Sequence, residues 1–189
     1  MDAERGEPQT APVIVRRERP GDHADVHALH RAAFTTDPAT GLARAGRDVP
    51  EARLVDELRQ DVAFLPHLSL VAVDGDEVLG HVIATRAWLE PLGNTALGLG
   101  PLGVRPDRQG GGIGTVLVHA VLAVAEAADE RLVALLGDPA YYRRFGFRPS
   151  ADLGVTPPDP GWGAHFQARR LAGPPVGGTF RYAAPFDRL

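Results

Sequence analysis

The chain has 189 residues, of which 44% are hydrophobic and 23% charged, and its formal net charge is −4. These proportions are typical of a soluble globular protein, and the length is enough to bury a full hydrophobic core. The mildly acidic balance gives no general attraction for nucleic acid or an anionic membrane, so we expect neither as a partner. The absence of cysteine excludes disulfides, thiol catalysis and cysteine-ligated metals. The 20 basic residues include no lysine, which excludes a Schiff-base lysine and a P-loop lysine.

The N-terminus and the apolar runs indicate where the protein is located. Residues 1–11 are polar and contain proline and glycine, and we expect them to form a disordered tail. They lack the apolar segment of a signal peptide, and no apolar run approaches the ~20 residues that span a bilayer. We therefore expect a cytoplasmic protein in which residues 12–189 form a single domain.

Hydrophobic periodicity predicts alternating strands and helices along the chain. In order, we expect a strand at 13–18, a helix at 22–35, a loop at 35–50, a helix at 51–61, a hairpin at 69–89 turning at Asp74-Gly75-Asp76, a strand at 92–104, a long helix at 113–129, a strand at 131–136, a short helix capped by Asp138, and strands at 165–171 and 179–186. This order predicts a mixed α/β fold.

The most informative segment is the turn that precedes the long helix. Four of the five residues from 110 to 114 are glycine, and Arg108 and Gln109 come directly before them. Successive backbone N–H groups at a helix N-terminus bind anions, and the helix dipole adds to the attraction. A sharp turn alone needs one glycine, so the pattern favours a site for a phosphate or pyrophosphate.

Two common nucleotide motifs do not fit. A Walker A loop needs a lysine after its last glycine, whereas Thr115 follows Gly114. Gly98, Gly100 and Gly103 match the spacing of a dinucleotide fingerprint, but Pro101 lies inside it and no helix follows. A nucleotide-binding protein of another type is therefore disfavoured.

Two motifs together resemble those of the GNAT superfamily of acetyl-CoA-dependent N-acetyltransferases. Residues 109–114, Gln-Gly-Gly-Gly-Ile-Gly, fit its pyrophosphate motif Gln/Arg-x-x-Gly-x-Gly/Ala. Tyr142, Gly146 and Phe147 fit its Tyr-x-x-x-Gly-Phe segment, and the order of elements over 13–189 is similar. The resemblance implies a central mixed sheet of about six to seven strands flanked by about four helices, in which two parallel strands splay apart to hold acetyl-CoA.

The resemblance also implies a function and a set of binding residues. The expected reaction is direct attack of a primary amine, belonging to a small molecule or, as second choice, to a protein or peptide, on the thioester of acetyl-CoA; no metal is implied. The expected cofactor-binding residues lie on the strand edge and in the turn: Leu102, Gly103, Val104, Arg108, Gln109, Gly110, Gly111, Gly112, Ile113, Gly114 and Thr115. A non-catalytic acyl-CoA sensor is the alternative, and it would not need Tyr142. The sequence leaves open whether the protein is a monomer or a homodimer.

The resemblance implies that Tyr142, at the position of the family's tyrosine, is the catalytic acid that would protonate the departing thiolate. Tyr141 is a rival, because adjacent helical residues point about 100° apart and only one of the two can face the thioester. The general base stays open. Its candidates are Asp37, His81, Glu90 and His119.

Three further groups carry weaker hypotheses. His23, His27 and His30 have helical spacing, and a solvated helix face is favoured over a metal site. Arg143 and Arg144 are candidates for contacts with coenzyme A phosphates or for a charged rim. Trp88, Trp162 and Phe166 are candidates for lining the acceptor pocket or for covering the core.

Overall fold

A computed structural model gives the structure of the chain and describes residues 12–35 and 49–189. The tail predicted at 1–11 and nearly all of the loop predicted at 35–50 lie outside these residues. The α-helices of the described part are α1 (His23–Ala33), α2 (Pro50–Gln60), α3 (Ile113–Ala127) and α4 (Pro139–Tyr142). Its strands are β1 (Ile14–Arg17), β2 (Ser69–Asp74), β3 (Glu77–Glu90), β4 (Asn94–Val104), β5 (Leu132–Leu136), β6 (Arg148–Pro149), β7 (Val155–Thr156), β8 (Phe166–Arg170) and β9 (Gly178–Arg181).

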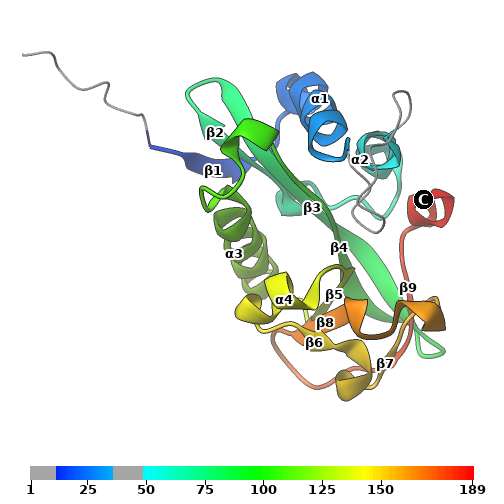
Figure 1. The fold of residues 1–189 in the computed structure, drawn as a ribbon. Coiled ribbons are helices and arrows are strands. Elements are labelled where there is room, and N and C mark those ends of the chain that lie inside the picture. Colours follow the sequence, from blue (N-terminus) through cyan, green and yellow to red (C-terminus); the bar gives the residue numbers. More distant parts are fainter. Residues whose placement is uncertain (1–11, 36–48) are drawn as a thin grey trace, which may run out of the picture.

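All of these strands join one mixed sheet (Figure 1). Its order is β1-β2-β3-β4-β5-β8-β6, with β9 pairing β3 and β7 pairing β9. The pairs β4–β5 and β7–β9 are parallel and the others are antiparallel. The predicted mixed α/β fold is confirmed. The nine strands exceed the predicted six to seven because β6 and β7, with two residues each, are too short to give a periodic signal.

Strand alternation distributes the helices over the two faces of the sheet. On β2, Leu70 and Ala72 pack in the core cluster that contains the apolar stripe of α3. Val71 and Val73 point to the opposite face and pack with Val26 of α1 and with α2. Figure 1 shows α3 on one side of the long β3–β4 ribbon, with α1 and α2 together on the other side.

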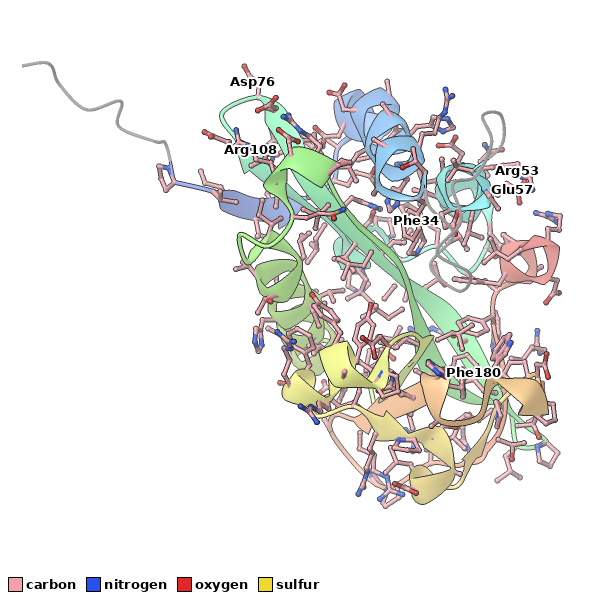
Figure 2. All side chains as sticks on the ribbon, in the orientation of Figure 1. Phe34, Arg53, Glu57, Asp76, Arg108 and Phe180 are labelled. Carbon is pink, nitrogen blue, oxygen red and sulfur yellow. The ribbon has the colours of Figure 1, made fainter. Side chains whose placement is uncertain are left out.

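The C-terminal part adds an aromatic cluster at the far end of the sheet. Phe166 of β8 and Phe180 of β9 are almost fully buried, and Figure 2 labels Phe180 in this region. The Tyr182 ring lies 4.8 Å from that of Phe180 and 4.4 Å from that of Phe186. The antiparallel pairing of Trp88–Glu90 with β9 fixes this cluster against β3.

None of the helices in residues 12–35 and 49–189 combines the length and apolarity needed to cross a bilayer.

Candidate functional site

The sheet opens between its two central parallel strands. β4 and β5 pair only at Leu97–Val133 and Gly98–Ala134. Beyond Gly98, β4 continues to Val104, and within the described residues only β3 pairs with this stretch. β5 turns away, and the Gly137 N–H donates to the His165 carbonyl at 2.9 Å. The predicted splay is present, and the free edge of β4 includes the three residues expected there, Leu102–Val104.

The turn before α3 presents backbone donors at an exposed surface. Gly112 is the N-cap residue of α3 with φ 86°, and no side chain caps the helix. A Cβ added to Gly110 or Gly112 would meet no heavy atom within 4 Å, so the space above the turn is open. The uncapped N–H groups at the start of a 15-residue helix leave room and positive potential for an anion.

Two side chains flank this turn. Gln109 donates from Nε2 to the Val104 carbonyl at 3.1 Å, which fixes the turn to the end of β4. The Arg108 guanidinium lies 3.7 Å from Asp107 and 3.9 Å from Glu77, and 40% of its side chain is exposed. Figure 2 places Arg108 beside the β2–β3 turn, where Asp76 is labelled. Both residues predicted for phosphate contacts therefore lie at the uncapped end of α3.

The two adjacent tyrosines point to different places. The Tyr141 hydroxyl is hydrogen bonded to Thr115 in the first turn of α3, and it would lie 2.9 Å from a Cβ on Gly114. The Tyr142 ring instead lies against Gly137, where a Cβ would come within 2.4 Å of it, and packs against Phe147 with ring centroids 5.7 Å apart. Tyr141 thus lies at the glycine-rich turn and Tyr142 at the end of β5, beside the splay.

Burial sets the protonation state of these phenols. Desolvation raises the pKa of Tyr142 well above its ordinary 10.0, and the neighbouring Tyr141 adds to the increase. The pKa of Tyr182 is also raised, by burial first and then by Tyr142, although the Leu136 backbone opposes the shift. Tyr142 and Tyr182 therefore lie near each other at the end of β5 and stay protonated at neutral pH. Sequence reasoning missed Tyr182.

Two glycines of β4 allow side chains to approach its backbone closely on the face opposite α3. A Cβ on Gly98 would lie 2.6 Å from the Tyr182 ring. A Cβ on Gly103 would lie 2.8 Å from His30 Nδ1. Between them, Gly100 is partly exposed, and a Cβ there would meet nothing within 4 Å. The glycine spacing that resembles a dinucleotide fingerprint reflects these close approaches in a strand.

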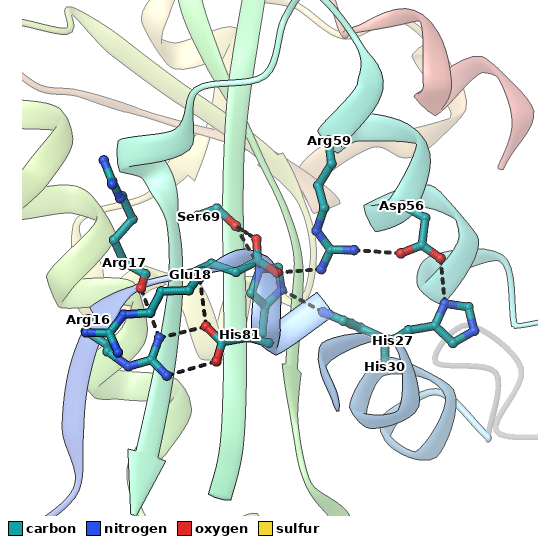
Figure 3. A network of polar contacts seen from close by, with 11 residues as sticks. Arg16, Arg17, Glu18, His27, His30, Asp56, Arg59, Ser69 and His81 are labelled. Atoms are coloured by element: carbon teal, nitrogen blue, oxygen red, sulfur yellow. Dashed lines mark hydrogen bonds and ion pairs between the residues drawn. The ribbon is translucent and has the colours of Figure 1, made fainter. Parts of the chain in front are cut away.

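A chain of buried polar side chains lies on this same face (Figure 3). His30 Nε2 is 2.9 Å from His81 Nδ1, and His81 Nε2 is 3.0 Å from Ser69 Oγ. Ser69 Oγ donates to Glu18 Oε2 at 2.6 Å, and Arg59 donates to Glu18 Oε1 at 2.5 Å. We call Glu18, Ser69, His81 and His30 the buried histidine network. His30, Ser69 and His81 are fully buried.

The donors of this network run in one direction. The Ser69 hydroxyl has one proton and gives it to the Glu18 carboxylate, which only accepts. His81 Nε2 must then carry a proton and donate to Ser69 Oγ. Because burial lowers the pKa of both histidines, they are neutral, so His81 Nδ1 is an acceptor and His30 Nε2 donates to it. His30 Nδ1 is left as a bare lone pair, and no hydrogen-bond partner lies next to it.

Glu18 stays ionised at the other end of the network. Burial alone would raise its pKa, but His81, 3.8 Å away, and the hydrogen bonds from Arg59 and Ser69 lower the pKa well below its ordinary 4.5. The Arg59 side chain is 7% exposed and compensates this buried charge. Arg59 in turn pairs with Asp56, which binds His27 at 2.6 Å.

The candidate bases separate into different environments. His81 belongs to the buried histidine network, whereas Glu90 lies at the end of β3 and pairs with Arg181 at 3.4 Å. His119 lies on the exposed side of α3, with its ring 5.1 Å from that of Phe145. Asp37 lies outside the described residues.

The solvated face predicted for the α1 histidines is wrong for His30. His23 is exposed and His27 is half-buried against Asp56, but His30 is fully buried. Its position four residues after the buried Val26 puts it on the core face of the helix. The four-residue spacing from Val26 is the feature of the sequence that could have identified His30 as buried. Residues 12–35 and 49–189 contain no cluster of acidic and histidine side chains suited to a metal ion.

The other aromatic and basic candidates mostly contact the core or each other. Phe166 is fully buried and Trp162 packs against its ring, so this pair covers the core. Trp88 lies beneath the Arg181 guanidinium at 4.5 Å. Arg144 lies over the Tyr141 ring at 4.9 Å. Arg143 is exposed.

The splayed sheet, the uncapped glycine-rich turn and the tyrosine at the end of β5 match the arrangement expected for an acyl-CoA-dependent transferase. Residues 66–149 match the family model described as "Acetyltransferase (GNAT) domain". The chain is 33% identical over 181 residues to the uncharacterized N-acetyltransferase YhbS of Escherichia coli strain K12, which covers 94% of this chain and 100% of YhbS.

Solved structures of similar proteins carry the relevant ligands. The crystal structure of E. coli YhbS in complex with CoA has a TM-score of 0.82 at 31% identity and covers 96% of this chain and 95% of that one. A GNAT family acetyltransferase from Brucella melitensis in complex with acetyl-CoA has a TM-score of 0.74 at 35% identity and covers 93% and 99%.

The chain belongs to the GNAT family of N-acetyltransferases. The predicted family, enzyme class and acetyl-CoA co-substrate are thereby confirmed.

Proposed function

We propose that this enzyme transfers the acetyl group of acetyl-CoA to a primary amine of a small molecule, by direct attack in a ternary complex. The observation that carries the proposal is the splay between β4 and β5. It has the uncapped turn before α3 at one end and Tyr142 beside the end of β5. When bound, acetyl-CoA supplies the thioester from which an amine takes an acetyl group.

The residues of the chain fit this co-substrate. The backbone N–H groups from Gln109 to Thr115 would hold the pyrophosphate, because the turn has open space where a Cβ would stand. Arg108 would add a charge-assisted contact with a phosphate oxygen. The free edge at Leu102–Val104 would pair with the amides of the pantetheine arm and donate an N–H to the thioester oxygen.

Tyr142 is the proposed acid. Its phenol is protonated at working pH because burial raises its pKa, and its ring is held between Gly137 and Phe147 at the end of β5. A proton from Tyr142 Oη to the departing sulfur would avoid the release of a free thiolate. Tyr141 is disfavoured, because its hydroxyl is hydrogen bonded to Thr115.

A small acceptor is favoured over a protein by the shape of β4 at Gly100. Gly100 is partly exposed, but Leu99 and Pro101 on either side are buried. Tyr182 and His30 lie over the backbone on either side of this opening. An exposed stretch of backbone limited to one residue, with a ring on either side, favours a compact primary amine. The cytoplasmic location, the single-domain organisation and the choice between monomer and homodimer stay predictions.

The test is release of coenzyme A thiol from acetyl-CoA across a panel of amines. Small primary amines should give saturable thiol release and an N-acetylated product by mass spectrometry. Peptides with free N-termini or lysines should react more slowly by kcat/KM. If peptides are the faster class, the small-molecule acceptor is wrong. If no amine raises thiol release above hydrolysis while acetyl-CoA still binds, the protein acts as a non-catalytic acyl-CoA sensor and the proposed function is wrong.

A further inference from the structure

His30 Nδ1 is a buried nitrogen that has no hydrogen-bond partner. A buried polar atom without a partner costs roughly 1–3 kcal/mol. Among the described residues three buried side-chain atoms are in this position: His30 Nδ1, Arg59 Nε and Thr85 Oγ1. Of these, His30 Nδ1 lies over Gly103, on the part of β4 where the thioester is expected. The other three members of the buried histidine network all have partners.

We propose that the buried histidine network is a proton relay for acetyl transfer, with His30 Nδ1 as the atom that takes the proton released by the acceptor amine. The proposal rests on the proposed function and names the base that the sequence leaves open. His30 is the catalytic residue in it. His81, Ser69 and Glu18 are positioning residues that act through His30.

The amine nitrogen bonds to the acetyl carbon, the carbon–sulfur bond breaks, and the amine proton passes to His30 Nδ1. The sulfur takes the proton of Tyr142. Return of one proton from the His30 imidazolium, through solvent, to the Tyr142 phenolate restores both residues.

The network stabilises the charge that His30 acquires. His30 Nε2–H donates to His81, and His81 Nε2–H donates toward Ser69 and the ionised Glu18, whose Oε2 lies 3.8 Å from His81 Nε2. These hydrogen bonds fix the imidazole tautomers, and the charge of Glu18 opposes the lowering of the His30 pKa by burial. Because the pKa of Glu18 is held low, the proton stays on an imidazole.

The charged and titratable groups around His30 come from four elements. They are His81 from β3, Glu18 from the segment after β1, Arg59 from α2 and His27 from α1 itself. His23 also acts on His81. Burial, His81, Arg59 and His27 lower the pKa of His30, and Glu18 opposes them. The neutral, proton-accepting form therefore dominates at neutral pH.

The first experiment needs no ligand. Nitrogen-15 NMR of histidine-labelled protein at pH 7.5 should show His30 and His81 as Nε2–H tautomers, with both Nδ1 atoms unprotonated. A protonated Nδ1 on His30 overturns the proposal, because the relay then has no acceptor.

The second experiment is a pH–rate profile of His30→Gln. Glutamine keeps an amide that can donate to His81 but has no nitrogen that accepts a proton. We expect kcat to fall about 10²-fold or more at pH 7.5 and the acid limb of the profile to disappear, with acetyl-CoA affinity changed less than about twofold. In Ser69→Ala, loss of the link to Glu18 should move the acid limb to lower pH.

His67→Gln is the matched control, because the His67 side chain is exposed and lies outside the buried histidine network, so rate and profile should stay unchanged. A folded His30→Gln variant with an unchanged rate and acid limb overturns the relay and leaves acetyl transfer standing. A wild-type protein that acetylates no amine contradicts the proposed function instead. Should His30→Gln fail to fold, the tautomers of the wild type still decide the proposal.

Discussion

The turn before α3 offers backbone N–H groups at an exposed surface, whereas the buried histidine network offers side chains from four separate segments. The turn needs only glycines and a helix start, and Gly110, Gly111 and Gly112 are all exposed. The network needs two histidines that are 51 residues apart and an arginine that compensates Glu18. Binding of an anion can thus be encoded locally, but a buried proton acceptor requires the whole fold.

The largest expected effect comes from Tyr142→Phe, which tests whether chemistry depends on side chains. The change removes only the hydroxyl, so kcat should fall about 10²–10⁴-fold while acetyl-CoA affinity survives. Steady-state kinetics and calorimetry measure the two quantities. Because the pKa of Tyr142 is raised, wild type should show no alkaline limb from this phenol below pH ~10.

Tyr141→Phe is the control for this prediction. It removes the hydrogen bond to Thr115 and should change kcat far less. Near-full turnover in Tyr142→Phe would remove Tyr142 from the acid role.

Gly112→Asp tests whether the turn before α3 binds the pyrophosphate of acetyl-CoA. The new carboxylate would point into the open space above the turn and repel the pyrophosphate, so Kd for acetyl-CoA should rise about 10–100-fold. Gly112→Asn is the matched control, since asparagine has the same shape and tolerates φ 86° without the charge. Equal affinities of the two variants by calorimetry would contradict an anion site here.

Gly103→Ala tests whether the network depends on a missing Cβ. The added carbon would lie 2.8 Å from His30 Nδ1 and 2.9 Å from Leu29, so His30 must shift. Crowding of this kind costs about 1–3 kcal/mol in urea unfolding, and the pH–rate profile should change as well.

Gly80→Ala is the control on the opposite face. Its Cβ would lie 2.8 Å from Ile113 and 2.9 Å from Leu117 of α3, so a comparable loss of stability is expected. Its acid limb should stay where it is in wild type. A shifted acid limb in Gly80→Ala would show that general crowding, and not the position of His30, controls the profile.

The smallest effect is the pH dependence of stability. Folding lowers the pKa of His30 and His81 below 6.5, so the unfolded chain binds more protons and stability is lost as pH falls below that value. Unfolding in urea at pH 5.5 should cost about 1–2 kcal/mol less than at pH 7.5. The difference should shrink in His30→Gln. An equal difference in both proteins would mean that other groups cause it.

The sequence predicted most elements to within a few residues, because local periodicity and capping determine them. The Asp138 cap is one example: its carboxylate accepts from the Ala140 N–H at 2.8 Å. The predicted turn before α3 and Tyr142 lie within short continuous motifs. Glu18, Ser69 and Tyr182 were not predicted, because each acquires its role only by meeting residues that are distant in the chain.

His30 shows where local patterns mislead. Its spacing from His23 and His27 suggested one polar face, and at 100° per residue the three histidines do lie within about 60° of one another, but His30 is at the edge of this face that adjoins Val26. Val26 and Leu29 mark the core side of α1, and His30 adjoins both. A buried histidine also needs a partner from another element, and His81 lies on a strand whose position depends on the sheet register.

The open edge of β4 has a consequence for the protein when no acetyl-CoA is bound. The backbone groups of Leu102–Val104 on the side of β5 then lack the partners that a pantetheine arm would supply. At a concentration 100 times Kd, a ligand stabilises the folded state by about 2.7 kcal/mol. The melting temperature should therefore rise with the concentration of acetyl-CoA, and storage with coenzyme A should extend the shelf life of the enzyme.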